Sequence, residues 1–386
     1  ITEQTKHIIN SGGLTYDVFF NEYKHKFSVY ASAQHTDRNS YYGADKAENA
    51  YGKTKDLTAV GGAMYVGNMD NCLFSPATFT GGLEYQYNSL HDVMTGYGRD
   101  LRQDVKIASG FVQNEWKLDY FTILAGFRLD KHNLVDNVIF SPRINTLWKP
   151  SDKFQGRLTW STGFRAPQAY DEDLHVAAVG GEAMEVRLAE GLKPERSNSF
   201  SGSVDWSFNF GHFQSNLLIE GFYTALNDVF YLESLGKDPV SGTLVQERRN
   251  GNGARVYGAN IDYKIAHGKE AQLQLGFTVQ RSRYTEAVRW SEDEDVAAIK
   301  RMPRTPDYYG YFTFSSAPLK NFDFSLSGVY TGRMIVPHFA GYIEKDRLEH
   351  TPDFMDFNLK LNYTFVLNDH LKLQVNGGVQ NIFNAF

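Results

Sequence analysis

The strongest regularity in the chain is strict alternation of apolar and polar residues. It is clearest over residues 271–279 and 357–365, and it recurs over 27–33, 200–210 and 322–330. Successive side chains of a strand point to opposite faces, so this period predicts β-strands with one face against an apolar environment. Spacing typical of a helix is rare and is confined to residues 182–190.

The predicted strands are long, and their connections alternate between short and long. About sixteen segments of roughly 9–15 residues are recognisable, which suits tilted membrane-spanning strands better than the shorter strands of soluble domains. Short connections such as 149–152 and 210–212 alternate with long ones such as 34–55 and 165–196. An up-and-down barrel with turns at one rim and loops at the other has this rhythm. We therefore predict an all-β fold, a large antiparallel transmembrane β-barrel.

The width of such a barrel decides which face of each strand points inward. Sixteen or so strands leave a lumen that side chains cannot fill, so the Gln, Asn, Ser and Thr face should border water and the apolar face lipid. Aromatic residues beside short connections, such as Trp148, Phe208 and Phe365, suit the membrane interface. The alternative is a large soluble β-sandwich, in which these rings would pack in the core.

Composition removes several classes of function. The chain has 386 residues, a formal net charge of -6 and the single cysteine Cys72, which excludes a disulfide framework and multi-cysteine metal sites. No basic patch dominates, so nucleic acid is not an expected partner. Patterns of the HExxH, GxSxG, Walker A and CxxC types are absent, and we predict that the protein is not an enzyme.

Three short stretches of the sequence resemble elements of a known family. Residues 160–167 read Trp-Ser-Thr-Gly-Phe-Arg-Ala-Pro, residues 191–197 read Gly-Leu-Lys-Pro-Glu-Arg-Ser, and residues 377–384 read Gly-Gly-Val-Gln-Asn-Ile-Phe-Asn. These are similar to the "FRAP", "NLKPE" and "VxNLFD" elements of TonB-dependent outer-membrane receptors. The residues that carry the resemblance are Phe164, Arg165, Ala166, Pro167, Leu192, Lys193, Pro194, Glu195 and Asn381.

We expect structural roles for these motif residues. Pro167 and Pro194 lack a backbone N–H, which suits points where a strand leaves or enters a sheet. Arg165 is expected to pair with a carboxylate of the following loop, and the candidates are Asp171, Glu172 and Asp173.

The resemblance implies a bacterial outer-membrane receptor whose barrel has 22 strands and follows an N-terminal plug with a TonB box. We find neither plug nor box, and expect residues 1–386 to form part of a receptor barrel as one domain. The implied function is active uptake of a scarce metal chelate, namely a ferric siderophore, haem or cobalamin. The implied partners are the TonB complex, through a plug not in this chain, membrane lipid, and a surface lipoprotein on the long loops.

Candidate ligand contacts lie in the long connections, where aromatic rings and a few polar groups suit a flat or bulky ligand. They are Tyr41, Tyr42, Tyr170, His175, Trp290, His338 and Tyr342. A histidine there could bind the iron of haem or the cobalt of a corrinoid, so the metal would arrive as cargo and no resident cofactor is expected. Loop packing is the alternative role for each residue. A passive porin-like channel and an outer-membrane scaffold for partner proteins are the alternative functions.

Overall fold

The computed structural model describes residues 2–43, 50–97, 99–168, 184–237, 239, 244–291, 293, 295–338, 340 and 343–385. Apart from one 3-10 turn at Thr95–Tyr97, every regular element in these ranges is a β-strand. No helix among the described residues is long and apolar enough to span a membrane.

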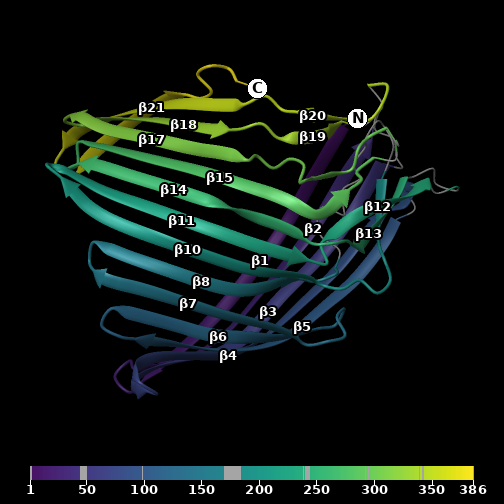
Figure 1. Ribbon diagram of the computed structural model, residues 1–386, viewed down its shortest axis with the longest axis horizontal. Coiled ribbons are helices and arrows are strands. Elements are labelled where there is room, and N and C mark those ends of the chain that lie inside the picture. The colour runs from purple at the N-terminus through teal and green to yellow at the C-terminus, as the bar shows by residue number, and fades with distance from the viewer. Residues whose placement is uncertain are drawn as a thin grey trace.

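One large antiparallel sheet dominates the molecule and curls round on itself (Figure 1). It has 17 strands, of which β16 (Ile299–Arg301) is a three-residue strand beside β15. The other sixteen agree with the number predicted from sequence. They are β1 (Thr2–Phe20), β2 (His25–Gly43), β3 (Tyr51–Cys72), β4 (Ser75–Met94), β5 (Arg99–Lys117), β6 (Phe121–His132), β7 (Ile139–Ser151), β8 (Phe154–Arg165), β10 (Glu195–Phe210), β11 (Phe213–Asn227), β14 (Ala254–His267), β15 (Ala271–Val288), β17 (Tyr308–Leu319), β18 (Phe322–Thr331), β21 (Phe354–Asn368) and β22 (Leu371–Val379).

Each of these strands pairs with the next in chain order, as in an up-and-down barrel wall. Within the described residues β1 pairs only with β2 and β22 only with β21, so these two strands are the edges of the sheet. Tight turns join strands at one end, where Asn321 and Gly268 have positive φ angles of 67° and 53°. Glycine has no Cβ to clash in that conformation, and asparagine tolerates it better than most residues.

The long connections lie at the opposite end, at the right in Figure 1. They contain small sheets of their own: β9 (Met184–Leu188) with β12 (Phe230–Lys237) and β13 (Leu244–Asn250), and β19 (Ile335–His338) with β20 (Arg347–His350). The predicted alternation of short and long connections is confirmed, but the predicted loop 34–55 is wrong in extent. Strand β2 runs to Gly43 and β3 begins at Tyr51, because both strands continue beyond the apolar band as a polar ladder.

The apolar faces point away from the barrel interior. Ile261 and Phe277 lie opposite each other on β14 and β15, and their side chains are 44% and 43% exposed. On the other face Asn260 donates to Glu220 at 3.0 Å and accepts from Thr278 at 2.9 Å. Apolar side chains therefore face outward and hydrogen-bonded polar side chains line the interior, which confirms the transmembrane barrel and excludes the soluble sandwich.

The best-buried side chains gather at the loop end of β2–β7. Met94, Ala50, Ile139 and Tyr42 are buried there. Gly52 permits the close packing, because a Cβ atom at this position would lie 2.6 Å from Cγ of Met94. The loop end of the barrel therefore has a small apolar core of its own, and this core holds the polar side chains of the mouth in place.

Candidate ligand-binding mouth and polar lumen

A hydrogen-bonded network lines the inner wall of β2–β6. The Tyr30 hydroxyl donates to Glu84 at 2.7 Å, and Nη2 of Arg128 donates to the same carboxylate at 2.8 Å. Nε of Arg128 also reaches Asp130 at 2.7 Å, and Ser109 donates to Asp130 at 2.6 Å. Because these carboxylates and the guanidinium are paired, the wall is hydrophilic and is held in one geometry.

A second cluster lies nearer the loops, and its members are almost entirely buried. Asp92 lies 2.8 Å from Nε of Arg99 and 3.6 Å from Nη2 of Arg38, and it accepts from Thr54 Oγ1 at 2.5 Å. Only 1% of the Asp92 surface is exposed. A buried carboxylate is tolerated when it is paired and hydrogen-bonded, so this cluster joins β2, β3, β4 and β5 at the mouth.

The segment after β8 turns inward onto this wall. Ala166 and Pro167 are buried, and Oε1 of Gln168 lies 3.2 Å from Nε2 of the fully buried His132. The Leu134 N–H donates to Nδ1 of His132 at 3.0 Å, so Nε2 carries the proton and donates to Gln168. Gln168 also lines a cavity of about 430 Å³ together with Arg38, Thr54 and Asn88. The "FRAP" proline thus ends the strand where the chain enters the lumen.

The structure joins the two halves of the main motif. Arg165 and Glu195 are direct cross-strand partners on β8 and β10, with Nη1 and Oε2 4.0 Å apart. Glu195 also accepts from the Phe230 N–H at 2.6 Å, and the guanidinium of Arg165 lies 5.9 Å from the Phe230 ring centre. Arg165 therefore has a carboxylate partner on the neighbouring strand. The expected partners at 171–173 lie outside the described residues.

Other motif residues shape the backbone. The backbone N–H of Lys193 donates to Asn250 Oδ1 at 2.8 Å, and its carbonyl accepts from Asn250 Nδ2 at 2.9 Å. Pro194 is buried beside them. Asn381 has a φ of 48° and its side chain bonds both the N–H and the carbonyl of Ala385, at 2.8 and 2.9 Å. The structural roles expected for the motif residues stay predictions.

A pocket of about 450 Å³ opens between the end of β15 and the small sheet of β12 and β13. Trp290, Tyr231 and Tyr284 contribute aromatic rings, and Glu233 and Glu286 contribute carboxylates. Asn252 Nδ2 donates to Glu286 at 2.5 Å, which fixes that carboxylate. Aromatic surface with a few oriented polar groups suits a bulky organic ligand that carries polar substituents.

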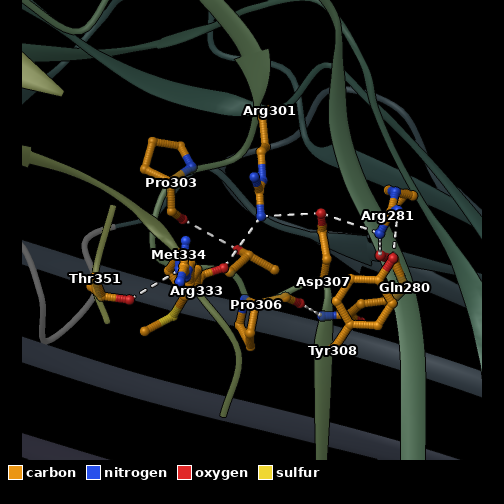
Figure 2. Close-up of polar contacts among 11 residues, drawn as sticks. Gln280, Arg281, Arg301, Pro303, Pro306, Asp307, Tyr308, Arg333, Met334 and Thr351 are labelled. Atoms are coloured by element: carbon orange, nitrogen blue, oxygen red, sulfur yellow. Dashed lines mark hydrogen bonds and ion pairs between the residues drawn. The ribbon is translucent and has the colours of Figure 1, made fainter. Parts of the chain in front are cut away.

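Polar contacts hold the loops around the mouth (Figure 2). Asp307 lies 3.1 Å from both Arg281 and Arg301, and Nη2 of Arg301 reaches the Arg333 carbonyl at 3.3 Å. The Met334 N–H donates to Thr351 Oγ1 at 3.0 Å. The Arg301–Arg333 contact links the β15–β17 and β18–β21 connections, and the Met334–Thr351 contact joins the two ends of the β18–β21 connection.

A second pair of contacts joins the same two connections further from the sheet. Ser291 donates to Asp346 at 2.5 Å, and Lys345 donates to Asp295 at 3.0 Å. The hydrogen bond to Asp295 raises the pKa of Lys345 above its usual value.

The predicted ligand contacts lie in different parts of the structure. Trp290 lines the mouth pocket, and His338 is exposed on β19 with Nε2 3.3 Å from Glu349. Tyr41 and Tyr42 are only 7% and 4% exposed, so their rings belong to the buried core at the loop end. Tyr170, His175 and Tyr342 lie outside the described residues. The ligand role of all these residues stays a prediction.

Sequence reasoning missed Tyr231, Tyr284 and Glu286, which share the pocket with Trp290. Tyr231 is far from the others in the chain, so no local spacing marks it as their neighbour. Tyr284 and Glu286 lie at alternate positions at the end of β15, a few residues before Trp290, so the period-two pattern could have placed them on one face. Within the described residues no group of three His, Cys, Asp or Glu side chains could hold a metal ion.

Comparison with known proteins identifies the class. Residues 4–382 match the family described as TonB dependent receptor-like, beta-barrel, and the chain belongs to this family. It is an outer-membrane protein, as expected from the sequence. It is 29% identical to the iron-regulated outer membrane virulence protein of Vibrio cholerae serotype O1 over 172 residues. These residues make up 44% of this chain and 25% of the relative.

Solved structures show the same fold at low sequence identity. The siderophore receptor PirA from Acinetobacter baumannii has a TM-score of 0.74 at 15% identity, covering 98% of this chain and 59% of the receptor. The FrpB iron transporter from Neisseria meningitidis has a TM-score of 0.70 at 14% identity, covering 97% of this chain and 58% of the transporter. The chain thus spans less than two thirds of the length of these relatives.

Proposed function

We propose that the protein takes part in active uptake of an iron chelate across the outer membrane, energised by TonB. The observation that carries this proposal is a wide barrel with a hydrogen-bonded polar inner wall and an aromatic pocket at its loop end. Such a barrel offers a hydrophilic route for cargo, and the pocket offers a first binding surface. TonB would act through a plug, which is a domain of the whole receptor and not of the region described.

The names of similar proteins favour a ferric siderophore over haem or cobalamin. Those names are siderophore receptor, iron transporter and iron-regulated outer membrane protein. The mouth pocket agrees with this choice, because its rings and carboxylates could contact a chelate without binding the metal itself.

Uptake measurements test the transport mechanism. Cells that express the full-length protein should accumulate radioactive iron from a ferric siderophore only when TonB is present. Uptake that persists without TonB would favour the porin-like channel. Absence of uptake in both strains, with the protein correctly inserted, would favour the scaffold.

Variants in the mouth pocket test the binding surface. Replacing both Trp290 and Tyr231 with alanine should weaken binding of the transported chelate about tenfold or more, since it removes two aromatic contacts. Trp148→Ala is the matched control, because Trp148 is an exposed ring on β7 near the short turns. Equal affinity in the wild type and the double variant would exclude this pocket as the binding surface.

A further inference from the structure

One wall of the mouth pocket is carried by the hairpin of β12 and β13, which is separate from the barrel sheet. Tyr231 and Glu233 on β12 and Gln246 on β13 line the pocket. Within the described residues, β12 and β13 form ladders only with each other and with β9, and none with the 17-stranded sheet. The position of this wall therefore depends on contacts other than sheet pairing.

The motif segment before β10 contacts both strands of this hairpin at its base. Phe230 begins β12 and Asn250 ends β13, and these direct cross-strand partners are called the root pair here. Oε1 of Glu195 accepts from the Phe230 N–H at 2.6 Å. The backbone of Lys193 makes two hydrogen bonds with the Asn250 side chain, at 2.8 and 2.9 Å. Two residues of one short segment thus hold both members of the root pair.

The other half of the motif contacts the ring of the same Phe230. The ring centre lies 5.9 Å from the guanidinium of Arg165 and 5.7 Å from that of Arg248. A cation at this distance attracts an aromatic ring. Arg165 also faces Glu195 across β8 and β10, with Nη1 and Oε2 4.0 Å apart. The two halves of the motif therefore meet at Phe230, one at its ring and the other at its backbone.

We propose that Glu195 and Asn250 are positioning residues that fix the hairpin and so set the shape of the mouth pocket. Tyr231 directly follows Phe230, so movement of the root pair displaces the Tyr231 ring. Gly251 follows Asn250 and leaves room for that ring, because a Cβ there would lie 3.0 Å from Cδ1 of Tyr231. A hydrogen bond to a carboxylate is stronger than one between neutral groups, and the Glu195 side chain is only 16% exposed. The expected effect on ligand affinity rests on the proposed function, whereas the fixing of the hairpin does not.

Distances between spin labels test the position of the hairpin without any ligand. In the full-length protein with Cys72→Ser, labels would be attached at Leu235→Cys on β12 and Ala287→Cys on β15, which are exposed positions. Electron paramagnetic resonance should give one narrow distance distribution. Glu195→Ala should broaden or shift this distribution. Glu195→Gln should restore it, because the amide oxygen can still accept from the Phe230 N–H.

Binding measurements test the consequence for the pocket. The purified full-length protein would be titrated with a ferric tris-catecholate chelate, and binding followed by tryptophan fluorescence. Glu195→Ala and Asn250→Ala should each weaken binding about fivefold, because a hairpin that occupies the competent position for only part of the time lowers the apparent affinity by that fraction. Glu195→Gln should bind like the wild type.

Asp205→Ala is the matched control on the same strand. Asp205 lies in the half of β10 nearer its short turn and accepts hydrogen bonds from Gln155 at 3.0 Å and Asn216 at 2.5 Å. Its removal should leave the distances and the affinity unchanged. A wild-type distance distribution in Glu195→Ala and Asn250→Ala, or equal broadening in Asp205→Ala, would overturn the proposal whatever the affinity. A broadened distribution with unchanged affinity would support the fixing of the hairpin and would exclude this pocket as the binding surface of the proposed function.

Discussion

Arginines occur in two contrasting settings near the loop end of this barrel. Arg38 and Arg99 point inward, are buried, and hold Asp92 between them. Arg255 and Arg283 point outward and are exposed opposite each other without a protein carboxylate in the described residues. A buried guanidinium requires a counter-charge from the protein, whereas one at the membrane surface can take its counter-charge from lipid or water.

This contrast shows how the same residue type serves two purposes in one barrel. The inner arginines fix four strand ends around a small core, so their contribution is to the stability of the mouth. The outer arginines face each other across a strand pair, and like charges in that position do not stabilise the pair. Substitutions in each group should therefore change stability by different amounts and with a different dependence on salt.

The largest effect is expected for Asp92→Asn. This change leaves the buried guanidinium of Arg99 without the charge of Asp92 and weakens the contact with Arg38, so the free energy of unfolding should fall by about 3 kcal/mol. The measurement is urea unfolding in detergent, followed by tryptophan fluorescence. Asp104→Asn, an exposed carboxylate on β5, is the control and should cost less than about 0.5 kcal/mol. A similar cost for both variants would contradict the role given to the inner cluster.

An intermediate effect is expected for Asp307→Asn. This substitution removes the carboxylate shared by Arg281 and Arg301 and should destabilise the protein by about 1 kcal/mol in neutral detergent. High salt should reduce that loss, because it screens the repulsion between the two arginines left without their carboxylate. A loss that is the same at low and high salt would show that Asp307 does not act through the charge of these arginines.

The smallest effect is expected for Lys345→Gln. Its ion pair with Asp295 lies on an exposed loop, where water and salt screen the attraction, so the unfolding midpoint should not change measurably at neutral pH. The pKa of Lys345 is raised by Asp295, so any contribution of the pair is present below the unfolded pKa of about 10.4 and is lost as pH rises through the folded value. A clear shift of the midpoint at pH 7 would mean that the loop contact matters more than its exposure indicates.

The period-two pattern was enough to predict the class of fold. Alternation at positions such as Leu275 and Phe277 identified the strands, and the rhythm of connections identified the up-and-down order. The motif around Arg165 and Glu195 predicted the family, which residues 4–382 confirm. Strand ends at the mouth were harder to place, because beyond the lipid both faces of a strand meet polar surroundings and the contrast between them fades.

The sequence by itself determined the strands, their order and the face that meets lipid, because these follow from local alternation and from the polarity of membrane and water. Only the tertiary structure decided which distant residues meet. It placed Tyr41 and Tyr42 in a core, joined Tyr231 to Tyr284 and Trp290, and aligned Arg255 with Arg283. Such contacts depend on strand register and on loop packing, and a shift of one residue in register would turn each side chain to the opposite face.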